Sequence, residues 1–298
     1  MAFRVILIEN EVQIKVKLNN LIVTKSGEDI WIPLDDISMI VMDNLYSTLS
    51  TRILCQLSEK GIGLMICNQE HLPTGFYSSY DNHSRASKVI GYQIKREDYQ
   101  ILWKKIIEIK ILNQSKAYLR ITGDIKGTEQ IAEFSKEVME GDKSNREAHA
   151  AKVYFNLLMG TSFSRGNADI ILNSGLDYGY AILRSYIARA CVGYGLNTQI
   201  GIHHKNEYNR FNLVDDLMEP IRPFVDMVVS EIMEGAEIFL PEHRRYLVNV
   251  LNMKISYRNK KMYMCNMIEN YVEQFAAFIM GKCDDIIFPD VEKFIGEN

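Results

Sequence analysis

Residues 84–117 read SRASKVIGYQIKREDYQILWKKIIEIKILNQSKA, and within this stretch the hydrophobic pattern changes from that of strands to that of helices. From about Tyr99, apolar residues recur at the spacing of an amphipathic helix: Leu102, Ile106, Ile109 and Leu112. Proline, which helix interiors tolerate poorly, is absent between Pro73 and Pro220. We therefore expect helical structure from about residue 84 onward.

The residues before this stretch have the period-two pattern of half-buried strands. Between residues 12 and 18, Val, Ile and Leu alternate with Gln and Lys. The turn-forming pairs Asn19-Asn20 and Ser26-Gly27 separate this run from the next apolar runs. The apolar runs predict a small β-rich, sandwich-like domain with one helix at about 51–60 and strands at residues 3–8, 12–18, 21–24, 30–32, 37–42 and 62–67.

The residues after this stretch predict a succession of helices. Their expected positions are about 128–140, 145–159, 174–194, 214–234, 242–254 and 264–280. Residues 256–264 are also compatible with a short hairpin around Asn259. The predicted fold class is α+β with two domains, a β-rich domain over residues 1–84 and a larger all-α domain over residues 85–298.

The composition is that of an ordinary globular chain. Of the 298 residues, 47% are hydrophobic and 24% are charged, which argues against extensive disorder. The five cysteines form no Cys-x-x-Cys pair, which argues against a disulfide framework or a zinc ribbon and suits a reducing compartment. No apolar run is long enough to span a membrane, and the N-terminal run ends at Glu9 without a cleavage site. We expect a cytoplasmic protein.

The net charge of −4 conceals a separation of charge along the chain. Residues 85–126 carry ten Lys and Arg against four acids, whereas residues 269–298 carry seven acids against two Lys. One interpretation is a solvated helix face together with an acidic tail. The other is a ridge of cations that binds phosphates of a nucleic acid. Charge patterning alone does not decide between them.

Three polar segments interrupt the apolar helical sequence and are candidates for a functional site. In the first, Ser144–His149, Ser144 and Glu147 have the spacing of a capping box at a helix start. The alternative is that Glu147 points into a cleft and binds a divalent cation. On a helix His149 faces away from Glu147, so we expect it to pack or to lie on the surface.

The second segment, Gly201–Arg210, contains the adjacent His203 and His204 in a polar stretch between expected helices. Loops on a rigid scaffold commonly carry binding and catalytic residues. The same histidines also suit ordinary hydrogen-bonded loop structure. The segment is therefore compatible with an imidazole that binds a ligand and also with histidines that only stabilise the loop.

The third segment, Asp215–Pro223, contains three acids and two prolines. Asp215 and Asp216 precede Glu219 by four and three residues, so either can share its helical face. Acids near a helix start also complement the helix dipole, which is the alternative to a functional role. Proline within this pattern bends the element and frees backbone groups.

Taken together, Glu147, His204 and Glu219 form a set of two carboxylates and one imidazole. Such mixed ligands suit Mg²⁺ or Mn²⁺ with open positions for substrate oxygens. A cation held in this way polarises a phosphodiester and stabilises the charge that builds on its oxygens. The set therefore predicts metal-dependent phosphodiester chemistry.

These segments resemble the CRISPR adaptation integrase, the first-numbered of the CRISPR-associated proteins, and the likeness is closest to its type II branch. The likeness spans nearly the whole chain, and four ordered motifs at compatible spacing make it specific. The residues that carry it are Ser144–Ala151, Leu176–Tyr180, Gly201–Arg210 and Asp216–Pro223.

The resemblance implies roles for the two domains and for individual residues. The β-rich domain is expected to serve dimerisation and partner docking, and the helical domain to be catalytic. Glu147, His204 and Glu219 fall on the catalytic, metal-binding positions, with Mg²⁺ or Mn²⁺ as cofactor. Asp216 matches a secondary acidic position of some relatives, and His203 is a second choice for the histidine. The basic residues near these motifs are candidate phosphate contacts: Arg146, Lys152, Arg165, Lys205 and Arg222.

The resemblance also implies a reaction and partners. The 3′-hydroxyl of a short double-stranded DNA fragment attacks a phosphodiester at the edge of CRISPR repeat DNA, with endonuclease activity as a further possibility. Homodimers are expected, two of them bridged by a small ferredoxin-like CRISPR-associated protein, together with other type II adaptation proteins. The alternatives are a non-catalytic DNA-binding scaffold and a general metal-dependent nuclease.

Overall fold

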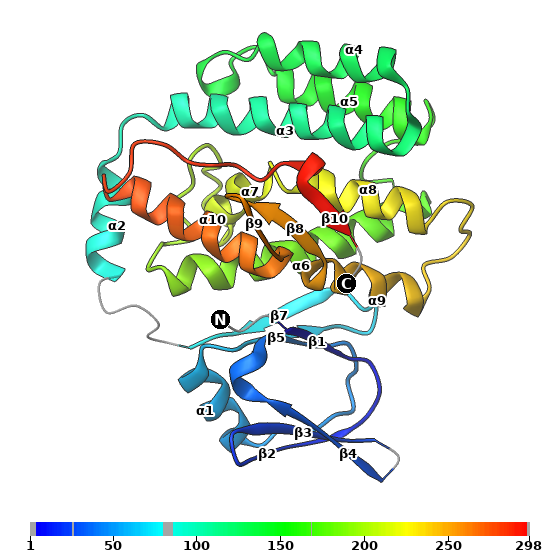
Figure 1. Cartoon of the computed structure of the whole chain (residues 1–298), viewed down its shortest axis with the longest axis vertical. Helices are drawn as coiled ribbons and strands as arrows, with labels where there is room; N and C mark the ends of the chain where they lie inside the picture. Colours follow the sequence, from blue (N-terminus) through cyan, green and yellow to red (C-terminus); the bar gives the residue numbers. More distant parts are fainter. Residues whose placement is uncertain (1–3, 26, 80–85, 168, 297–298) are drawn as a thin grey trace.

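A computed structural model of the chain describes residues 4–25, 27–79, 86–167 and 169–296. It contains a β-rich N-terminal region and a larger helical region, in agreement with the predicted α+β class (Figure 1). The predicted boundary at residue 84 lies outside the described residues. None of the helices in these ranges is long and apolar enough to cross a lipid bilayer.

The N-terminal region consists of two sheets and one helix. A four-stranded sheet has the order β1 (Arg4–Ile8), β5 (Ile37–Met42), β6 (Gly63–Cys67) and β7 (Pro73–Tyr77). The antiparallel second sheet contains β2 (Gln13–Lys17), β3 (Asn20–Lys25) and β4 (Glu28–Pro33). Apolar residues of both sheets and of α1 (Thr51–Lys60) form one core, which explains the predicted sandwich-like character.

Strand β5 joins this region to the helices because both of its faces are buried. Ile40 and Met42 point into the core between the sheets. Met39 and Val41 alternate with them and pack into the core of the helical region. A continuous apolar run, rather than an alternating one, is what a strand buried on both faces requires.

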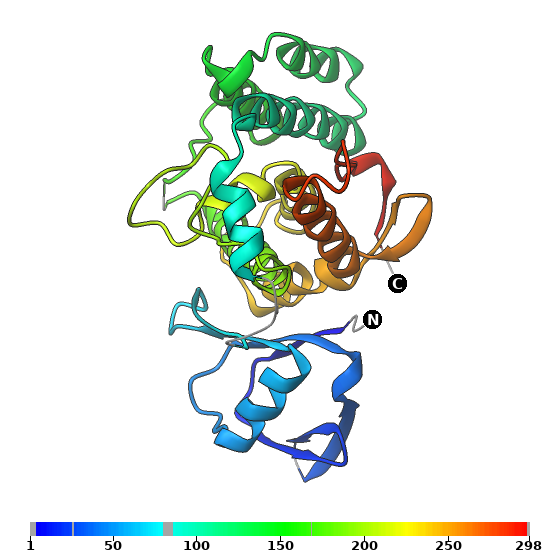
Figure 2. The same cartoon turned by 90° about the vertical axis from the view of Figure 1, so that its left-hand side faces the viewer.

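The helical region is built around α6 (Ile171–Gly193), most of whose residues pack into the main core. Helices α8 (Arg222–Ile232), α9 (Pro241–Asn249) and α10 (Met264–Ile279) lie beside α6. Helices α3 (Tyr99–Thr122), α4 (Ile125–Lys136) and α5 (Arg146–Met159) form a layer on the side away from the sheets (Figures 1 and 2). Helix α2 (Ala86–Lys95) connects the two regions.

The helix predicted at 214–234 is wrong as a single element. The chain forms α7 (Asn212–Met218), turns through residues 219–221 and then forms α8. Pro220 has no N–H to continue the first helix, whereas Pro223 suits the first turn of the second. This interruption places Glu219 in a turn instead of on a helix face.

The helical region also contains a small sheet, so it is not purely α-helical. Strands β8 (Lys254–Tyr257) and β9 (Lys260–Tyr263) form the hairpin that was the alternative prediction for this segment. Arg258 and Asn259 turn the chain with φ of 50° and 59°, the left-handed backbone that tight hairpins need. Strand β10 (Phe294–Gly296) pairs with β8, and neither β7 nor β10 was predicted.

The acidic C-terminal segment lies along the basic helix α3 (Figure 1). Lys105 pairs with Asp285, and Lys116 Nζ lies 2.9 Å from Asp290 Oδ1. Arg120 Nη1 donates to the Phe294 carbonyl at 2.6 Å. Basic side chains of α3 are therefore paired with acids of the same chain, which argues against a continuous phosphate-binding ridge on this helix.

Candidate functional site

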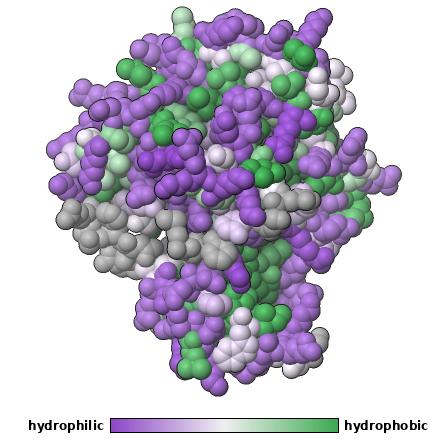
Figure 3. Space-filling view, viewed as in Figure 1, coloured by the Kyte–Doolittle hydropathy of each residue, from purple (hydrophilic) through white to green (hydrophobic). Residues whose placement is uncertain are grey.

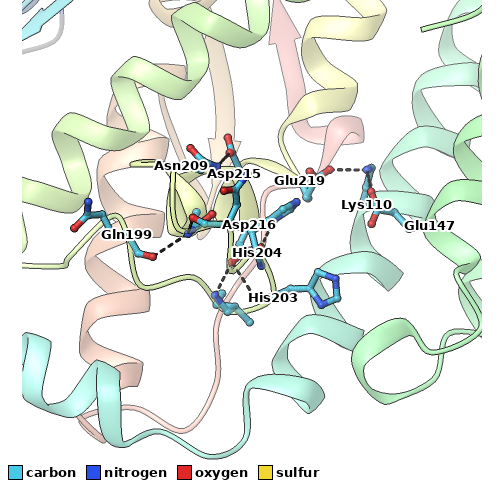
Figure 4. Close-up of polar contacts among 12 residues, drawn as sticks. Lys110, Glu147, Gln199, His203, His204, Asn209, Asp215, Asp216 and Glu219 are labelled. Atoms are coloured by element: carbon cyan, nitrogen blue, oxygen red, sulfur yellow. Dashed lines mark hydrogen bonds and ion pairs between the residues drawn. The ribbon is translucent and has the colours of Figure 1, made fainter. Parts of the chain in front are cut away.

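The candidate site lies where α3, α5 and the segment 201–222 meet (Figure 4). Lys110 of α3 contacts both of the glutamates singled out from the sequence. Its Nζ atom lies 2.7 Å from Glu147 Oε1 and 2.5 Å from Glu219 Oε2. The side chains of Lys110 and Glu219 are buried, whereas that of Glu147 is 30% exposed. The site is thus a buried ion pair with one of its two carboxylates open to solvent.

The charges at this site offset the cost of burial. Burial alone would raise the pKa of Glu219, but Arg222 and Lys110 outweigh burial and lower that pKa. Burial alone would lower the pKa of Lys110, but Glu219 and Glu147 outweigh it and raise that pKa. Lys110 and Glu219 are therefore both charged at neutral pH.

Glu219 is positioned by the turn between α7 and α8. Asn113 of α3 fixes this turn, since its Nδ2 donates to the Pro220 carbonyl at 2.8 Å. Nε of Arg222, the first residue of α8, lies 3.1 Å from Glu219 Oε1. The carboxylate therefore lies between two cations that come from different helices, Lys110 and Arg222.

Glu147 lies in the first turn of α5, but the predicted capping box does not form. The Asp142 carboxylate instead accepts the backbone N–H groups of Arg146 and Glu147 at 2.8 and 3.0 Å. The Ser144 hydroxyl is buried and has no hydrogen-bond partner. Because Asp142 satisfies the helix start, the Glu147 side chain is free to turn toward Lys110.

His204 lies in the loop before α7, and its ring is oriented by a buried carboxylate. Its Nδ1 is 2.6 Å from Asp216 Oδ1. This hydrogen bond is the main cause of a raised pKa for His204, and burial opposes it. Because Nδ1 is occupied, Nε2 is the ring nitrogen that remains for a ligand. His204 also helps to lower the pKa of Glu219, so the two side chains share one electrostatic environment.

Asp216, predicted as a secondary acid, is fully buried and organises the histidine loop. Its oxygens accept the backbone N–H groups of Ile202, His203 and His204 at 2.5, 3.0 and 3.2 Å. The loop packs so tightly that a Cβ at Gly201 would lie 2.3 Å from the His204 carbonyl oxygen. Both oxygens of Asp216 already accept hydrogen bonds, so its role is to orient the His204 ring and the loop around it.

The rings of His203 and His204 contact Trp103 in different ways. Its ring stacks on Trp103 of α3, with centroids 4.4 Å apart and planes 4° apart. The ring of His204 meets the same Trp103 edge-on at 5.8 Å. Trp103 therefore packs against both rings of the histidine loop, and it is the ring of His204, not that of His203, that is bonded to Asp216.

Two of the five predicted phosphate-contacting residues are held by internal contacts. Arg222 pairs with Glu219 at the site. Arg165 donates to Asn173 Oδ1 at 2.6 Å and to Asp177 Oδ1 at 2.7 Å. Neither guanidinium is free to follow a nucleic-acid backbone without giving up these bonds.

Of the other three predicted phosphate contacts, two are exposed and one is also held by an internal ion pair. Lys152 on α5 and Lys205 in the histidine loop are exposed. Arg146 is partly exposed, with its Nε 3.1 Å from Glu137 Oε2. His149 is exposed on α5, in agreement with the prediction from its spacing.

The residues at the site include side chains of the types that hold a divalent cation. Across the described ranges, no three His, Cys, Asp or Glu side chains are gathered closely enough to hold a metal. However, the ammonium of Lys110 already stands as a cation between Glu147 and Glu219. Glu219 Oε2 is buried, and the Lys110 ammonium is the cation that it contacts. Carboxylate oxygens and an imidazole nitrogen are the donors that Mg²⁺ and Mn²⁺ accept.

Sequence reasoning missed Lys110 and Trp103. Both lie in the buried stripe of α3, together with Ile106 and Ile107. The signal that could have found Lys110 is its charge at a position that the helical period assigns to the core. A lysine there requires an anionic partner, and the acids of the other motifs are the candidates.

The chain matches the sequence profile of the family described as CRISPR associated protein Cas1 over residues 5–260. It is similar to the CRISPR-associated endonuclease Cas1 of Neisseria meningitidis serogroup C, with 31% identity over 95% of this chain and 94% of that protein. These two matches cover both the β-rich and the helical region.

Solved structures show the same fold. A casposase bound to integration product covers 97% of this chain and 93% of its own, with a TM-score of 0.76 at 20% identity. A CAS1 protein from Thermotoga maritima covers 96% and 99%, with a TM-score of 0.74 at 17% identity. A chain of a Cas6-RT-Cas1--Cas2 complex covers 98% and 36%, with a TM-score of 0.72 at 18% identity.

Proposed function

This chain belongs to the Cas1 family of CRISPR-associated proteins, and on that basis we propose that it is a metal-dependent DNA integrase of CRISPR adaptation. The observation that carries the proposal is the convergence of Glu147 and Glu219 on one cation position, beside a histidine oriented by Asp216. These residues come from separate segments of the chain. Their convergence supports a common chemical role.

In the proposed site, Glu147, His204 and Glu219 are the residues that hold Mg²⁺ or Mn²⁺. The ion, when bound, supplies Lewis acidity at a phosphate oxygen. Asp216 fixes the His204 ring through Nδ1, which would leave Nε2 as the nitrogen that holds the ion. Arg222 holds the Glu219 carboxylate in its charged form from the opposite side.

The proposed reaction is attack of a DNA 3′-hydroxyl on a phosphodiester of the repeat. One phosphodiester forms as another breaks, and the departing 3′-oxygen takes a proton, so the bonds balance. Such an exchange depends mainly on positioning and on neutralising charge. Lys152 and Lys205 are the exposed cations that would hold the DNA backbone, together with the partly exposed Arg146.

Cleavage of DNA by the same site is the second candidate function. The Neisseria relative is named an endonuclease, whereas a structural neighbour is a casposase bound to integration product. If water attacked the phosphodiester in place of the 3′-hydroxyl, the same site would hydrolyse DNA. Product analysis separates joined from cleaved strands. A non-catalytic scaffold would yield neither product.

The proposed partners are a double-stranded DNA fragment, CRISPR repeat DNA and a second copy of this chain. The N-terminal region exposes Leu18, Ile30 and Trp31, which suits the predicted dimerisation. Figure 3 shows hydrophobic surface on this region below the more hydrophilic helices. A similar chain in a Cas1–Cas2 assembly supports the proposal of a small CRISPR-associated partner, for which a ferredoxin-like fold is expected. The type II assignment, with its further adaptation proteins, and a cytoplasmic location remain parts of this proposal.

An integration assay tests the proposed function. Wild type is expected to join a DNA fragment to repeat DNA in Mn²⁺ with the small partner, and to stop in chelator. Glu147→Ala, His204→Ala and Glu219→Ala are expected to reduce joining at least about a hundredfold, because each removes a ligand or a charge at the site. The control is His149→Ala, an exposed residue of the same helix as Glu147. Normal joining by His204→Ala would contradict the site assignment.

A further inference from the structure

Lys110 is an unusual residue for its position. It lies in the middle of α3 among buried side chains, including Ile107 and Ile111, and its own side chain is 8% exposed. Lysine is rarely buried without an anionic partner, because burial removes its hydration. Here one ammonium serves two carboxylates that the chain brings from α5 and from the turn before α8. Figure 4 shows Lys110 next to Glu147 and across from Glu219.

The ammonium and a divalent cation would compete for the same atoms. Nζ is within 2.7 Å of Glu147 Oε1 and 2.5 Å of Glu219 Oε2. A Mg²⁺ or Mn²⁺ ion binds carboxylate oxygens at about 2.1 Å. An ion on these two oxygens would therefore be in contact with Nζ, and like charges at that distance repel strongly in a buried site. Both cations cannot occupy the position together.

We propose that Lys110 is a built-in counter-cation, which holds Glu147 and Glu219 together without metal and which a divalent ion must displace. This inference rests on the proposed metal site and adds a residue that sets its affinity. In the metal-free protein the ammonium keeps the two carboxylates from repelling each other. It also lowers the apparent affinity for metal, because displacing it opposes binding.

A purely structural salt bridge makes the opposite prediction for metal binding. If Lys110 only supported the fold, its loss would loosen the carboxylates and weaken metal binding or leave it unchanged. If Lys110 competes with the ion, its loss leaves two uncompensated carboxylates that a divalent ion can neutralise. The sign of the change in affinity therefore separates the two roles.

The test compares Lys110→Met with wild type in Mn²⁺ titrations followed by electron paramagnetic resonance of the free ion. We expect Lys110→Met to bind Mn²⁺ about tenfold more tightly. Its melting temperature should fall by several degrees in chelator and approach that of wild type at saturating Mn²⁺, because bound metal stabilises the native state. Lys110→Arg, which keeps the charge, should retain weak binding. Lys104→Met, at an exposed site on the same helix, is the matched control.

Wild-type protein provides a second measurement if Lys110→Met does not fold. Amine acetylation followed by mass spectrometry should label Lys110 slowly in chelator and faster in Mn²⁺, with Lys104 labelled equally in both. Unchanged or weaker Mn²⁺ binding by Lys110→Met, no metal dependence of Lys110 labelling, or no Mn²⁺ binding by wild type would overturn the inference. Wild type that binds Mn²⁺ with the expected Lys110 response but joins no DNA would contradict the proposed function alone.

Discussion

At the scale of single residues, the site is defined by how each charge is compensated. Lys110 and Arg222 pair with Glu219, and both oxygens of Asp216 accept hydrogen bonds from the histidine loop. A fifth charged side chain, Asp226 of α8, is compensated less well. The Tyr180 hydroxyl donates to its carboxylate, and no cation forms an ion pair with it among the described residues.

Asp226 makes the stability of the protein depend on pH. Burial raises its pKa to about 6, although the Tyr180 hydrogen bond and Arg222 act in the opposite direction. A carboxyl whose pKa is higher in the folded than in the unfolded state binds more protons when folded. The free energy of unfolding therefore falls as the pH rises from about 4 to about 6.

We expect Asp226→Asn to raise the free energy of unfolding by up to roughly 3 kcal/mol at pH 7, because a shift of one unit corresponds to about 1.4 kcal/mol. The gain should disappear below about pH 4, where the wild-type carboxyl is protonated in both states. Urea unfolding at a series of pH values measures it. The same substitution at the exposed Asp284 should leave the pH profile unchanged. A gain that persists at pH 3 would point to packing instead of charge.

At the scale of elements, α3 organises the site through one face. Trp103 on its buried face stacks on the histidine loop, and Lys110 lies between the two glutamates. Asn113 on the same face donates hydrogen bonds to two backbone carbonyls. Asn113 Nδ2 donates to the Pro220 and Pro289 carbonyls at 2.8 and 2.9 Å. One side chain thus joins the Glu219 turn and the C-terminal segment to the same helix.

We expect Asn113→Ala to lower the free energy of unfolding by about 3 kcal/mol, since it leaves buried carbonyl groups without donors. Because the Glu219 turn loses its anchor, DNA joining should fall more than at an equally destabilised variant elsewhere. Urea unfolding and the joining assay check the two effects. Gln100→Ala, an exposed residue of the same helix, is the control. Full activity of Asn113→Ala would show that the turn holds without this contact.

Most elements could be predicted from the sequence because their hydrophobic periods are regular. The break between α7 and α8 could not, since the apolar period continues through Pro220 and only the proline marks the interruption. The short strands β7 and β10 depend on pairing with distant strands, which a local pattern does not contain. In the candidate site, the polar motifs indicated Glu147 and Glu219. The helical period could have marked Lys110 as a buried charge, but its pairing with both glutamates depends on how α3 packs against α5 and the turn before α8.

At the scale of the whole molecule, a few buried polar contacts fix the β-rich region against the helices. Arg244 of α9 has its Nε 2.9 Å from Oδ2 of Asp43, which follows β5 and is fully buried. His71 contacts the other oxygen of Asp43 at 2.8 Å. The neighbouring Arg245 pairs with Glu9 at the surface.

We expect Arg244→Met to lower the free energy of unfolding by about 3 kcal/mol, because it removes the arginine that pairs with the buried Asp43 carboxylate. Arg245→Met should lower it less, because the Arg245 side chain is 58% exposed and water and salt screen its charge. Chemical denaturation of the two variants measures the difference between adjacent arginines. Equal effects at both positions would contradict the assigned importance of the Asp43 contact.

The pairing of residues 285–296 with α3 has a consequence for the order in which contacts form during synthesis. Helix α3 leaves the ribosome long before residues 285–296, yet Lys105, Lys116 and Arg120 depend on that segment for their partners. Asn113 likewise receives one of its two acceptors from Pro289. Folding during translation can therefore complete the N-terminal sheets early. These contacts of α3 form only after residues 285–296 have been synthesised, so a chain truncated before Asp285 would leave Lys105, Lys116 and Arg120 without these partners and Asn113 without one of its acceptors.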